Sequence, residues 1–434
     1  MRYNFTSARE AADFMHEIGI IDEHLGVLRQ PTAVNIPAQA PPIKICTAAM
    51  NDSSGGSDGG GGIGFNSLDA FMAAVVESLE RQLPSYATQH HLLRASYRQL
   101  GQQATDPFQF IPYADDQYVD GFPCRKYHHD LELNWTQAWN VGEQRLTRIP
   151  AQIGGTAYDF ARHGEPFLIE QTSTGTAGHM DARRAIISSV QELVERHATM
   201  DAWYAKGPTY LVDPDDLFNS DPNWSRLGRF LHDQAFTVRL LYFPNIFNIP
   251  VTWCVLTGEK SVFFKPFAVG ASARPSLWES AKKSLFETMQ NLVYFSRATG
   301  AFPPIVRGPL PRPSAVLTPP QHLAFYALSG DLRPISWLWT SAKGTLKLKP
   351  HMPDIDVSGE VLAHFLAQVR ATKREWLLLD FTPNGYRQRG FRFVRSLLSH
   401  FVPMNGAHVL PGKRFVSRLG HAPSFYAATP HPFP

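Results

Sequence analysis

The segment SSVQELVER, residues 188–196, combines two acids with an apolar face. Its residues are mostly ones that favour or tolerate an α-helix. On a helix Glu192 and Glu195 fall on one stripe with Ser188, because side chains three and four positions apart are neighbours. Arg196 lies on the same stripe, four residues after Glu192. A neighbouring stripe is apolar and predicts the core side of the helix; it consists of Ile187, Val190 and Val194.

Two carboxylates side by side near buried surface repel each other. The pKa of one of them rises unless a cation lies between them. A magnesium ion with a phosphate is one natural answer, since Mg²⁺ prefers oxygen ligands. The competing interpretation is a solvated helix face on which Arg196 bonds its own neighbours, and a single E-x-x-E-R segment favours it.

A second copy of the pattern changes this balance. Residues 77–81 read ESLER, with Ala73 standing where Ser188 stands in the other copy. Apolar side chains recur beside this copy at helical spacing, namely Leu68, Phe71, Met72, Val75, Val76 and Leu79. Two helices that each present an acidic pair predict one metal site, with the ligands Glu77, Glu80, Glu192 and Glu195.

The composition describes a globular chain without the marks of a nucleic-acid or membrane protein. The chain has 434 residues, which suffices for one large or two ordinary domains. Hydrophobic residues make up 44% and charged residues 18%, and the net charge of +3 is too small to indicate nucleic acid. No apolar run reaches the length of a membrane span. The three widely spaced cysteines predict reduced thiols in a cytoplasm.

A glycine-rich stretch precedes the first E-x-x-E-R segment. Residues 55–59 match G-x-S-x-G around Ser57, and residues 59–64 match G-x-G-x-x-G. The helix is expected only near Leu68, which disfavours a nucleophile elbow. A dinucleotide fingerprint needs an acid after a second strand, and Glu80 is expected on a helix. A phosphate-binding loop and a flexible surface loop both remain open.

The remaining pattern predicts an α/β fold with mixed sheets and flanking helices. A helical lead-in from Ser7 to about Ile20 and a proline-rich connector, residues 31–42, come first. Later segments alternate between strand and helix patterns; strands are expected at residues 43–47, 236–243, 250–257, 263–269, 376–383 and 390–397, and helices from residue 275 and over residues 355–372.

The chain ends with P-x-P-x-P, residues 430–434. Proline fixes φ and removes backbone donors, so this tail is expected to be a stiff, extended rod. Such a rod loses little freedom when it threads into a pocket.

These features together resemble the YcaO superfamily, within it the stand-alone cyclodehydratases of azole- and azoline-containing ribosomal peptides. The resemblance runs in order over residues 45–434, from the glycine stretch through both E-x-x-E-R segments to the proline tail. A Gly-Ala turn with an E-x-x-Q helix and a D-x-T-P strand lie between them.

The resemblance implies a YcaO-like fold that binds ATP and Mg²⁺. It also implies that a Cys, Ser or Thr side chain of a precursor peptide attacks the preceding carbonyl. The oxyanion is then phosphorylated by ATP and phosphate is expelled, which yields a thiazoline or oxazoline. Amidine or thioamide formation and a non-catalytic scaffold role are the alternatives.

Roles for particular residues follow from the resemblance by motif. The metal ligands would be Glu77, Glu80, Glu192 and Glu195. The cofactor-binding residues would be Ser188, Arg81, Arg196, Glu287 and Gln290. The catalytic tail would supply Pro430, Pro432 and Pro434. The chain departs from its relatives at three positions where they have polar nucleotide contacts, Ala177, Met180 and Arg184.

The resemblance also implies the domain layout and the partners. Residues 1–45 form the lead-in and connector, and residues 46–434 form the ATP-binding cyclodehydratase domain. The lead-in is too short for a leader-binding domain. A separate E1-like or winged-helix protein that binds the leader of the precursor peptide is therefore expected. An FMN-dependent azoline dehydrogenase is expected in the same complex.

Overall fold

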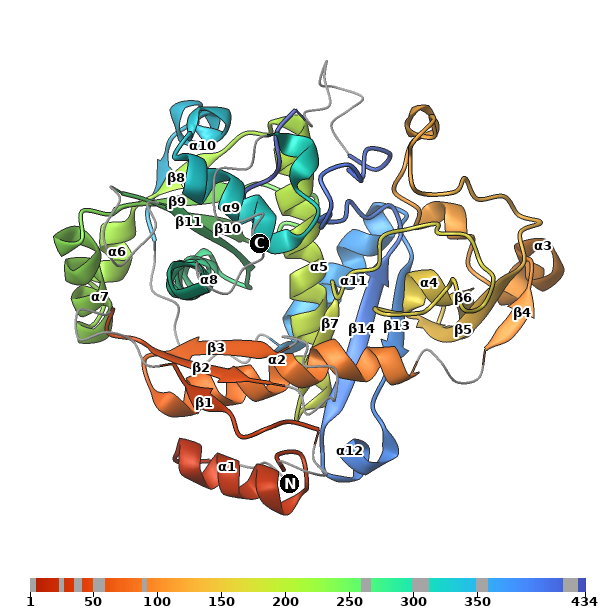
Figure 1. Ribbon diagram of the computed structural model, residues 1–434, viewed down its shortest axis with the longest axis horizontal. Coiled ribbons are helices and arrows are strands. Elements are labelled where there is room, and N and C mark those ends of the chain that lie inside the picture. The colour runs from red at the N-terminus through yellow and green to blue at the C-terminus, as the bar shows by residue number, and fades with distance from the viewer. Residues whose placement is uncertain are drawn as a thin grey trace.

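Helix α5 (Ala182–Ala205) runs through the middle of the protein, with sheets on either side (Figure 1). It begins after Asp181, whose carboxylate accepts hydrogen bonds from the backbone N–H groups of Arg183 and Arg184. It ends at Lys206, which adopts the left-handed conformation (φ 46°). Sixteen of its 24 residues are buried, so α5 is a core element and not a solvated surface helix.

The computed structural model describes residues 5–22, 27–34, 41–49, 59–87, 92–258, 267–298, 312–348, 358–416 and 428–434. Within them the chain forms three sheets joined and covered by helices, which confirms the predicted α/β class with mixed sheets (Figure 1). The Ser57 segment and the first residues of the helix expected from 355 lie outside the described residues.

The largest sheet packs against α5. Its strands are β4 (Leu93–Ala95), β5 (Leu133–Asn140), β6 (Arg145–Pro150), β7 (Thr176–His179), β13 (Trp376–Asp380) and β14 (Arg392–Leu398). The order is β4-β5-β13-β14-β7, with β6 paired to β5, and every pair is antiparallel. The strand β7 therefore lies at the edge of this sheet and leads directly into α5.

A second sheet lies on the other side of α5. Its strands are β8 (Tyr210–Val212), β9 (Thr237–Phe243), β10 (Val251–Thr257), β11 (Phe267–Ala273) and β12 (Thr345–Leu346), in the order β11-β10-β9-β8-β12. The predicted hairpin is confirmed, since β9 and β10 pair in register from Thr237–Thr257 to Phe243–Val251. Helix α8 (Leu277–Ala298) packs against β10 and β11, whose residues are almost all buried.

The third sheet is small and antiparallel. It consists of β1 (Thr32–Ala33), β2 (Lys44–Ala48) and β3 (Gly60–Gly64) in that order. Helix α2 (Ser67–Ala87) lies along β2 and β3, and α1 (Ala8–Glu17) packs on α2. The predicted lead-in thus contributes a helix and a strand to the same packed unit. The Ser7 side chain caps α1 at the Glu10 N–H (3.2 Å), as half of the expected capping box.

Shorter helices surround these layers. They are α3 (Tyr97–Leu100), α4 (Ala151–Gly154), α6 (Pro214–Phe218), α7 (Pro222–Asp233), α9 (Pro319–Ser329), α10 (Trp337–Thr340), α11 (Ser358–Ala371) and α12 (Asn384–Gln388). None of the helices in the described ranges has the length and apolarity needed to cross a bilayer.

The described part of the glycine stretch is the strand β3, whereas a loop was expected there. A Cβ on Gly62 would lie 1.9 Å from the carbonyl oxygen of Ala70, and one on Gly60 would lie 2.5 Å from the backbone nitrogen of Ser78. Both contacts come from α2, so glycine is required because the helix lies directly against the strand. The Gly60 N–H also donates to the Ser78 hydroxyl (2.6 Å).

Replacing Gly62 with alanine should separate β3 from α2. We expect the free energy of unfolding to fall by about 2 kcal/mol, because overpacking at a backbone contact cannot relax through a side chain. Urea denaturation of the full chain measures the change. The matched control is Gly142→Ala, where the nearest atom to a Cβ is Asn140 Oδ1 at 3.6 Å. Equal stability of the two variants would contradict the packing role of Gly62.

Candidate functional site

The first acidic pair lies on α2, beside the outer edge of β3. The Gly61 N–H donates to Glu77 Oε2 (3.0 Å), and Arg81 Nη2 donates to Glu77 Oε1 (2.6 Å). Arg81 Nη1 also donates to the carbonyl of Gly59 (2.8 Å), which ties the helix to the strand. The Glu77 side chain is 32% exposed, so it remains accessible for a ligand.

The second acid of this pair joins the two E-x-x-E-R helices. Glu80 Oε1 accepts a hydrogen bond from the Gly178 N–H (2.5 Å), and Gly178 lies on β7, which leads into α5. Burial raises the pKa of Glu80 well above its ordinary value, and the charges of Glu192 and Glu77 raise it further. Sequence segments far apart in the chain therefore meet at this carboxylate.

The acidic pair on α5 surrounds an arginine. Arg196 Nε lies 3.5 Å from Glu195 Oε1 and 4.0 Å from Glu192 Oε1. The Gly175 N–H donates to Glu192 Oε2 (3.2 Å). Burial raises the pKa of Glu192 to about 7 and that of Glu195 to about 8, and the charge of Glu287 acts in the same direction on both. Arg196 therefore balances the charge of these carboxylates only in part.

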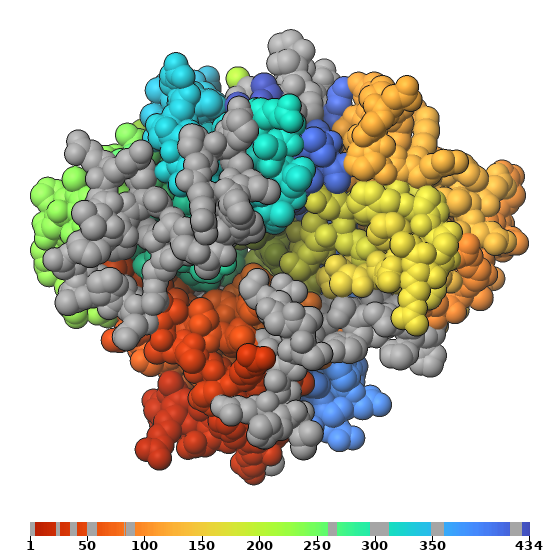
Figure 2. All heavy atoms as spheres, in the orientation of Figure 1, coloured from red at the N-terminus to blue at the C-terminus, as the bar shows by residue number. Residues whose placement is uncertain are grey.

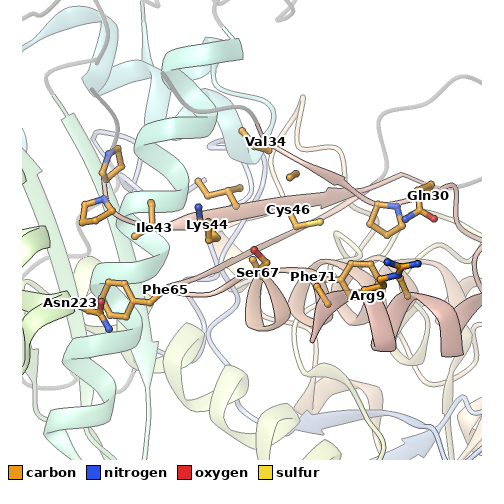
Figure 3. A pocket seen from close by; sticks show the side chains of 18 of the residues that line it. Arg9, Gln30, Val34, Ile43, Lys44, Cys46, Phe65, Ser67, Phe71 and Asn223 are labelled. Atoms are coloured by element: carbon orange, nitrogen blue, oxygen red, sulfur yellow. The ribbon is translucent and has the colours of Figure 1, made fainter. Parts of the chain in front are cut away.

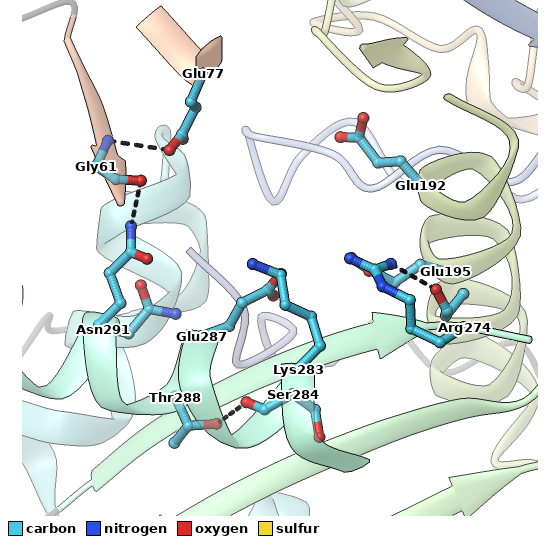
Figure 4. Close-up of polar contacts among 12 residues, drawn as sticks. Gly61, Glu77, Glu192, Glu195, Arg274, Lys283, Ser284, Glu287, Thr288 and Asn291 are labelled. Carbon is cyan, nitrogen blue, oxygen red and sulfur yellow. Dashed lines mark hydrogen bonds and ion pairs between the residues drawn. The ribbon is translucent and has the colours of Figure 1, made fainter. Parts of the chain in front are cut away.

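Helix α8 closes the site from a third side. Lys283 Nζ lies 4.0 Å from Glu287 Oε1, and Gln290 Nε2 donates to the carbonyl of Gly61 (3.2 Å). The polar edge of β3 is thus bonded from both α2 and α8. Figure 4 shows side chains from α2, α5 and α8 directed towards one shared space; they are Glu77, Glu192, Glu195, Lys283 and Glu287.

The donor set fits a magnesium nucleotide better than an ion held by protein alone. Carboxylate oxygens are preferred Mg²⁺ ligands, and a cation here would relieve the repulsion that raises the pKa values. Among the residues that the structure describes, no three His, Cys, Asp or Glu side chains are close enough to hold one ion. The predicted four-carboxylate cage is therefore not preformed. Mg²⁺ usually takes one or two carboxylates together with phosphate oxygens and water, which this spread arrangement allows.

Ser188 does not join the acidic cluster. It is exposed and makes no hydrogen bond within the described ranges, whereas its neighbour Ser189 is buried. The Ser189 hydroxyl donates to the carbonyl of Gly175 (2.6 Å) and accepts from the Ser396 N–H (2.8 Å). Ser189 thus fixes the turn whose Gly175 N–H binds Glu192. The hydroxyl that holds this turn is therefore that of Ser189, and the role of Ser188 in cofactor binding stays a prediction.

Three cations near the cluster were missed by the sequence analysis. Arg274 follows β11 and lowers the pKa of Glu195 against the effect of burial. Lys283 stands four residues before Glu287, a spacing that was visible in the sequence. Arg395 on β14 is buried and donates to carbonyls in the turn before β7, and its charge lowers the pKa of Glu192. Only the pairing of β14 with β7 brings Arg395 here.

The three departures from the expected nucleotide contacts lie at the start of α5. Ala177 is buried on β7 opposite Val394, and Met180 is partly buried against the core. Arg184 is exposed in the first turn of α5. Nucleotide contacts at the first two positions can therefore come only from the backbone or from apolar contact.

The proline tail is buried, as the rod hypothesis expects. Pro430 and Pro432 are buried and Pro434 is half-buried. Tyr326 of α9 donates its hydroxyl to the carbonyl of Pro430 (2.5 Å). Figure 1 places the C-terminus in the middle of the view, beside α8 and α9. The catalytic role of the three prolines stays a prediction.

A separate groove lies away from the acidic cluster. It has a volume of about 870 Å³ and lies between α1, the small sheet and the start of α7, with Arg9, Lys44, Phe71 and Asn223 among its lining residues (Figure 3). The hollow visible in Figure 2 is a different feature, where the teal, yellow and orange segments meet.

Comparisons with known proteins agree with this site. A family model described as YcaO cyclodehydratase, ATP- and Mg²⁺-binding, matches residues 61–401. That match spans both E-x-x-E-R helices and Glu287. No curated protein sequence matches the chain.

Three solved structures have a similar fold. A heterocyclase in complex with substrate and cofactor is 17% identical (TM-score 0.73; 93% of this chain, 54% of that one). YcaO from Methanopyrus kandleri bound with AMPPCP and Mg²⁺ is 14% identical (TM-score 0.62; 90% of each chain). The E. coli microcin synthetase McbBCD complex with pro-MccB17 bound is 12% identical (TM-score 0.60; 93% and 96%). At these identities the likeness concerns the fold, and the chain spans about half the length of the heterocyclase.

The metal-free chain should lose stability as the pH rises. Glu192 and Glu195 have pKa values raised from 4.5 in the folded state, so the folded chain binds their protons more tightly than the unfolded chain. Their contribution therefore falls between about pH 5 and pH 8. In EDTA, the unfolding temperature of Glu195→Gln should fall less over this range than that of the wild type. Glu17→Gln, an exposed site on α1, is the control and should follow the wild type. Parallel pH profiles for wild type and Glu195→Gln would contradict the raised pKa.

Proposed function

The chain belongs to the YcaO cyclodehydratase family, and from that premise we propose that it is an ATP-dependent peptide cyclodehydratase. It converts Cys, Ser or Thr residues of a ribosomal precursor peptide into thiazolines or oxazolines. The observation that carries the proposal is the meeting of acidic side chains from α2 and α5 at one space, where the pKa values of Glu80, Glu192 and Glu195 are raised.

Bound Mg-ATP supplies the phosphoryl group that turns the amide oxygen into a leaving group. One or two of the carboxylates of Glu77, Glu80, Glu192 and Glu195 would bind the metal directly, together with phosphate oxygens and water, and the others would lie around it. Arg196 and Lys283 balance charge beside them. Glu287 and Gln290 of α8 would lie beside the bound nucleotide. Gln290 donates to the carbonyl of Gly61 and so fixes the edge of β3. These residues position the nucleotide and balance its charge, and they do not transfer protons.

The substrate and partners belong to the same proposal. A precursor peptide, a separate leader-binding protein and an azoline dehydrogenase form the working complex. The E. coli microcin synthetase, whose structure has pro-MccB17 bound, has a similar fold and supports this arrangement. Within it, residues 46–434 act as the catalytic domain, and the lead-in supports the small sheet through β1. The free cysteines Cys46, Cys124 and Cys254 fit a reducing cytoplasm.

Incubating the chain with the leader-binding protein, a Cys- or Ser-rich precursor and Mg-ATP should remove one water from the peptide per ring formed. Glu192→Gln and Glu195→Gln should each lower turnover by about 100-fold, because each removes charge that the metal and phosphates require. Mass spectrometry of the peptide and phosphate release are the measurements.

The control for this experiment is Glu143→Gln, a half-exposed carboxylate on the β5–β6 turn that should leave turnover unchanged. A mass gain from sulfur replacing oxygen would instead indicate thioamide formation. Folded protein that binds no nucleotide would indicate a scaffold subunit. Undiminished turnover in both glutamine variants would contradict the assigned role of α5.

A further inference from the structure

The residues between the tail prolines anchor the tail in different ways. Phe433 is 2% exposed and meets the Trp253 ring edge-to-face, with centroids 4.6 Å apart. His431 is 3% exposed and stacks on His322 of α9, with centroids 3.7 Å apart and the planes 7° from parallel. Phe433 thus contributes apolar burial, whereas His431 brings polar nitrogens into the core.

The protonation of His431 follows from its surroundings. Its Nε2 lies 2.9 Å from the carbonyl oxygen of Asn405, which can only accept, so Nε2 carries the proton. Burial lowers the pKa of His431 well below its ordinary value, so the ring is neutral. Its Nδ1 is buried without a hydrogen-bond partner in the described structure. The whole polar attachment of this side chain is therefore its bond to Asn405.

Asn405 belongs to a loop, Met404–Ala407, that is held tightly elsewhere. The Glu170 carboxylate accepts from the N–H groups of Gly406 (3.1 Å) and Ala407 (3.0 Å). Tyr204 of α5 donates its hydroxyl to the Asn405 side chain. His322 faces the Gly406 carbonyl through Nε2 (3.1 Å). These contacts hold Asn405, Gly406 and Ala407, and the preceding residue, Met404, is buried in the core (8% exposed).

Met404 contacts the arginine of the acidic cluster. Arg196 Nη1 lies 2.7 Å from Met404 Sδ, while Arg196 Nε faces Glu195 and Glu192. The carboxylates around Arg196 outweigh its burial and raise its pKa, so it remains charged. A continuous set of contacts thus leads from His431 through Asn405 and Met404 to Arg196.

We propose that His431 is a positioning residue: its bond to Asn405 holds Met404 against Arg196 and so fixes Arg196 between Glu192 and Glu195. The inference rests on the proposed function of this site. It assigns the tail an effect on the metal-binding carboxylates through Arg196, in addition to any contact that the prolines make with substrate.

His431→Phe keeps the ring and the stack but removes the Nε2–H donor. Binding of AMPPCP with Mg²⁺ to the full chain, measured by calorimetry, should weaken roughly tenfold. His431→Gln places an amide donor near the position of Nε2 and should restore affinity to within about threefold of the wild type. Wild-type affinity in His431→Phe, or no recovery in His431→Gln, would overturn the proposal.

Phe433→Leu separates positioning from simple tail stability. It should lower the unfolding temperature without weakening nucleotide binding, because Phe433 has no polar link to the loop. Met404→Leu should weaken nucleotide binding as much as His431→Phe does. A double variant with His431→Phe and Met404→Leu should bind the nucleotide as tightly as either single variant, because both changes break the same set of contacts. Additive losses, or affinity that merely follows unfolding temperature, would overturn the proposal.

The same titrations distinguish this inference from the proposed function. A wild-type chain that binds the nucleotide but forms no ring refutes only the cyclodehydratase proposal. A wild-type chain that binds no Mg²⁺–AMPPCP refutes both.

Discussion

The crowding of buried and half-buried carboxylates is the constraint on which the rest of the structure depends. Glu80, Glu192 and Glu195 all have raised pKa values because burial and their neighbours disfavour the charged forms. A fold keeps such groups together only if surrounding elements cannot move apart. Helix α5 meets this condition because it is buried along most of its length between two sheets. Arg196 relieves part of the repulsion, and the remainder favours a divalent cation.

Backbone donors are the second requirement, and they explain the glycines. Glu77, Glu80 and Glu192 each accept a hydrogen bond from a glycine N–H, those of Gly61, Gly178 and Gly175. A Cβ on Gly175 would lie 2.3 Å from the carbonyl of Ser396, and one on Gly178 would lie 2.5 Å from the Phe393 ring. Each glycine therefore allows a strand or turn to approach its neighbour closely enough to bind a carboxylate. The glycine stretch and the S-x-G turn serve the acids and need not bind phosphate directly.

The repeated E-x-x-E-R spacing was enough to predict two helices with paired acids, since helical periodicity is local. Strand patterns on both sides of a turn predicted the β9–β10 hairpin, and the rigidity of proline predicted a tail that can enter a pocket. The sequence pattern could not identify Ser189 or Arg395, because their roles depend on β14 lying beside β7. It also treated residues 60–64 as part of a loop, because glycine composition alone does not reveal a helix packed against the strand. Tertiary contact decided each of these positions.

The tail illustrates why a rigid segment suits this site. Proline fixes φ, so residues 430–434 lose little conformational entropy when they are buried. That saving helps a short segment to remain ordered inside the core, where the His431 side chain bonds Asn405 and the side chains of Tyr326 and His322 bond the tail carbonyls. A flexible tail would lose more conformational entropy on burial and would need more contacts to stay in the same place. Because the loop that receives this bond also contacts Arg196, order in the tail and the placement of charge in the acidic cluster are parts of one packing arrangement.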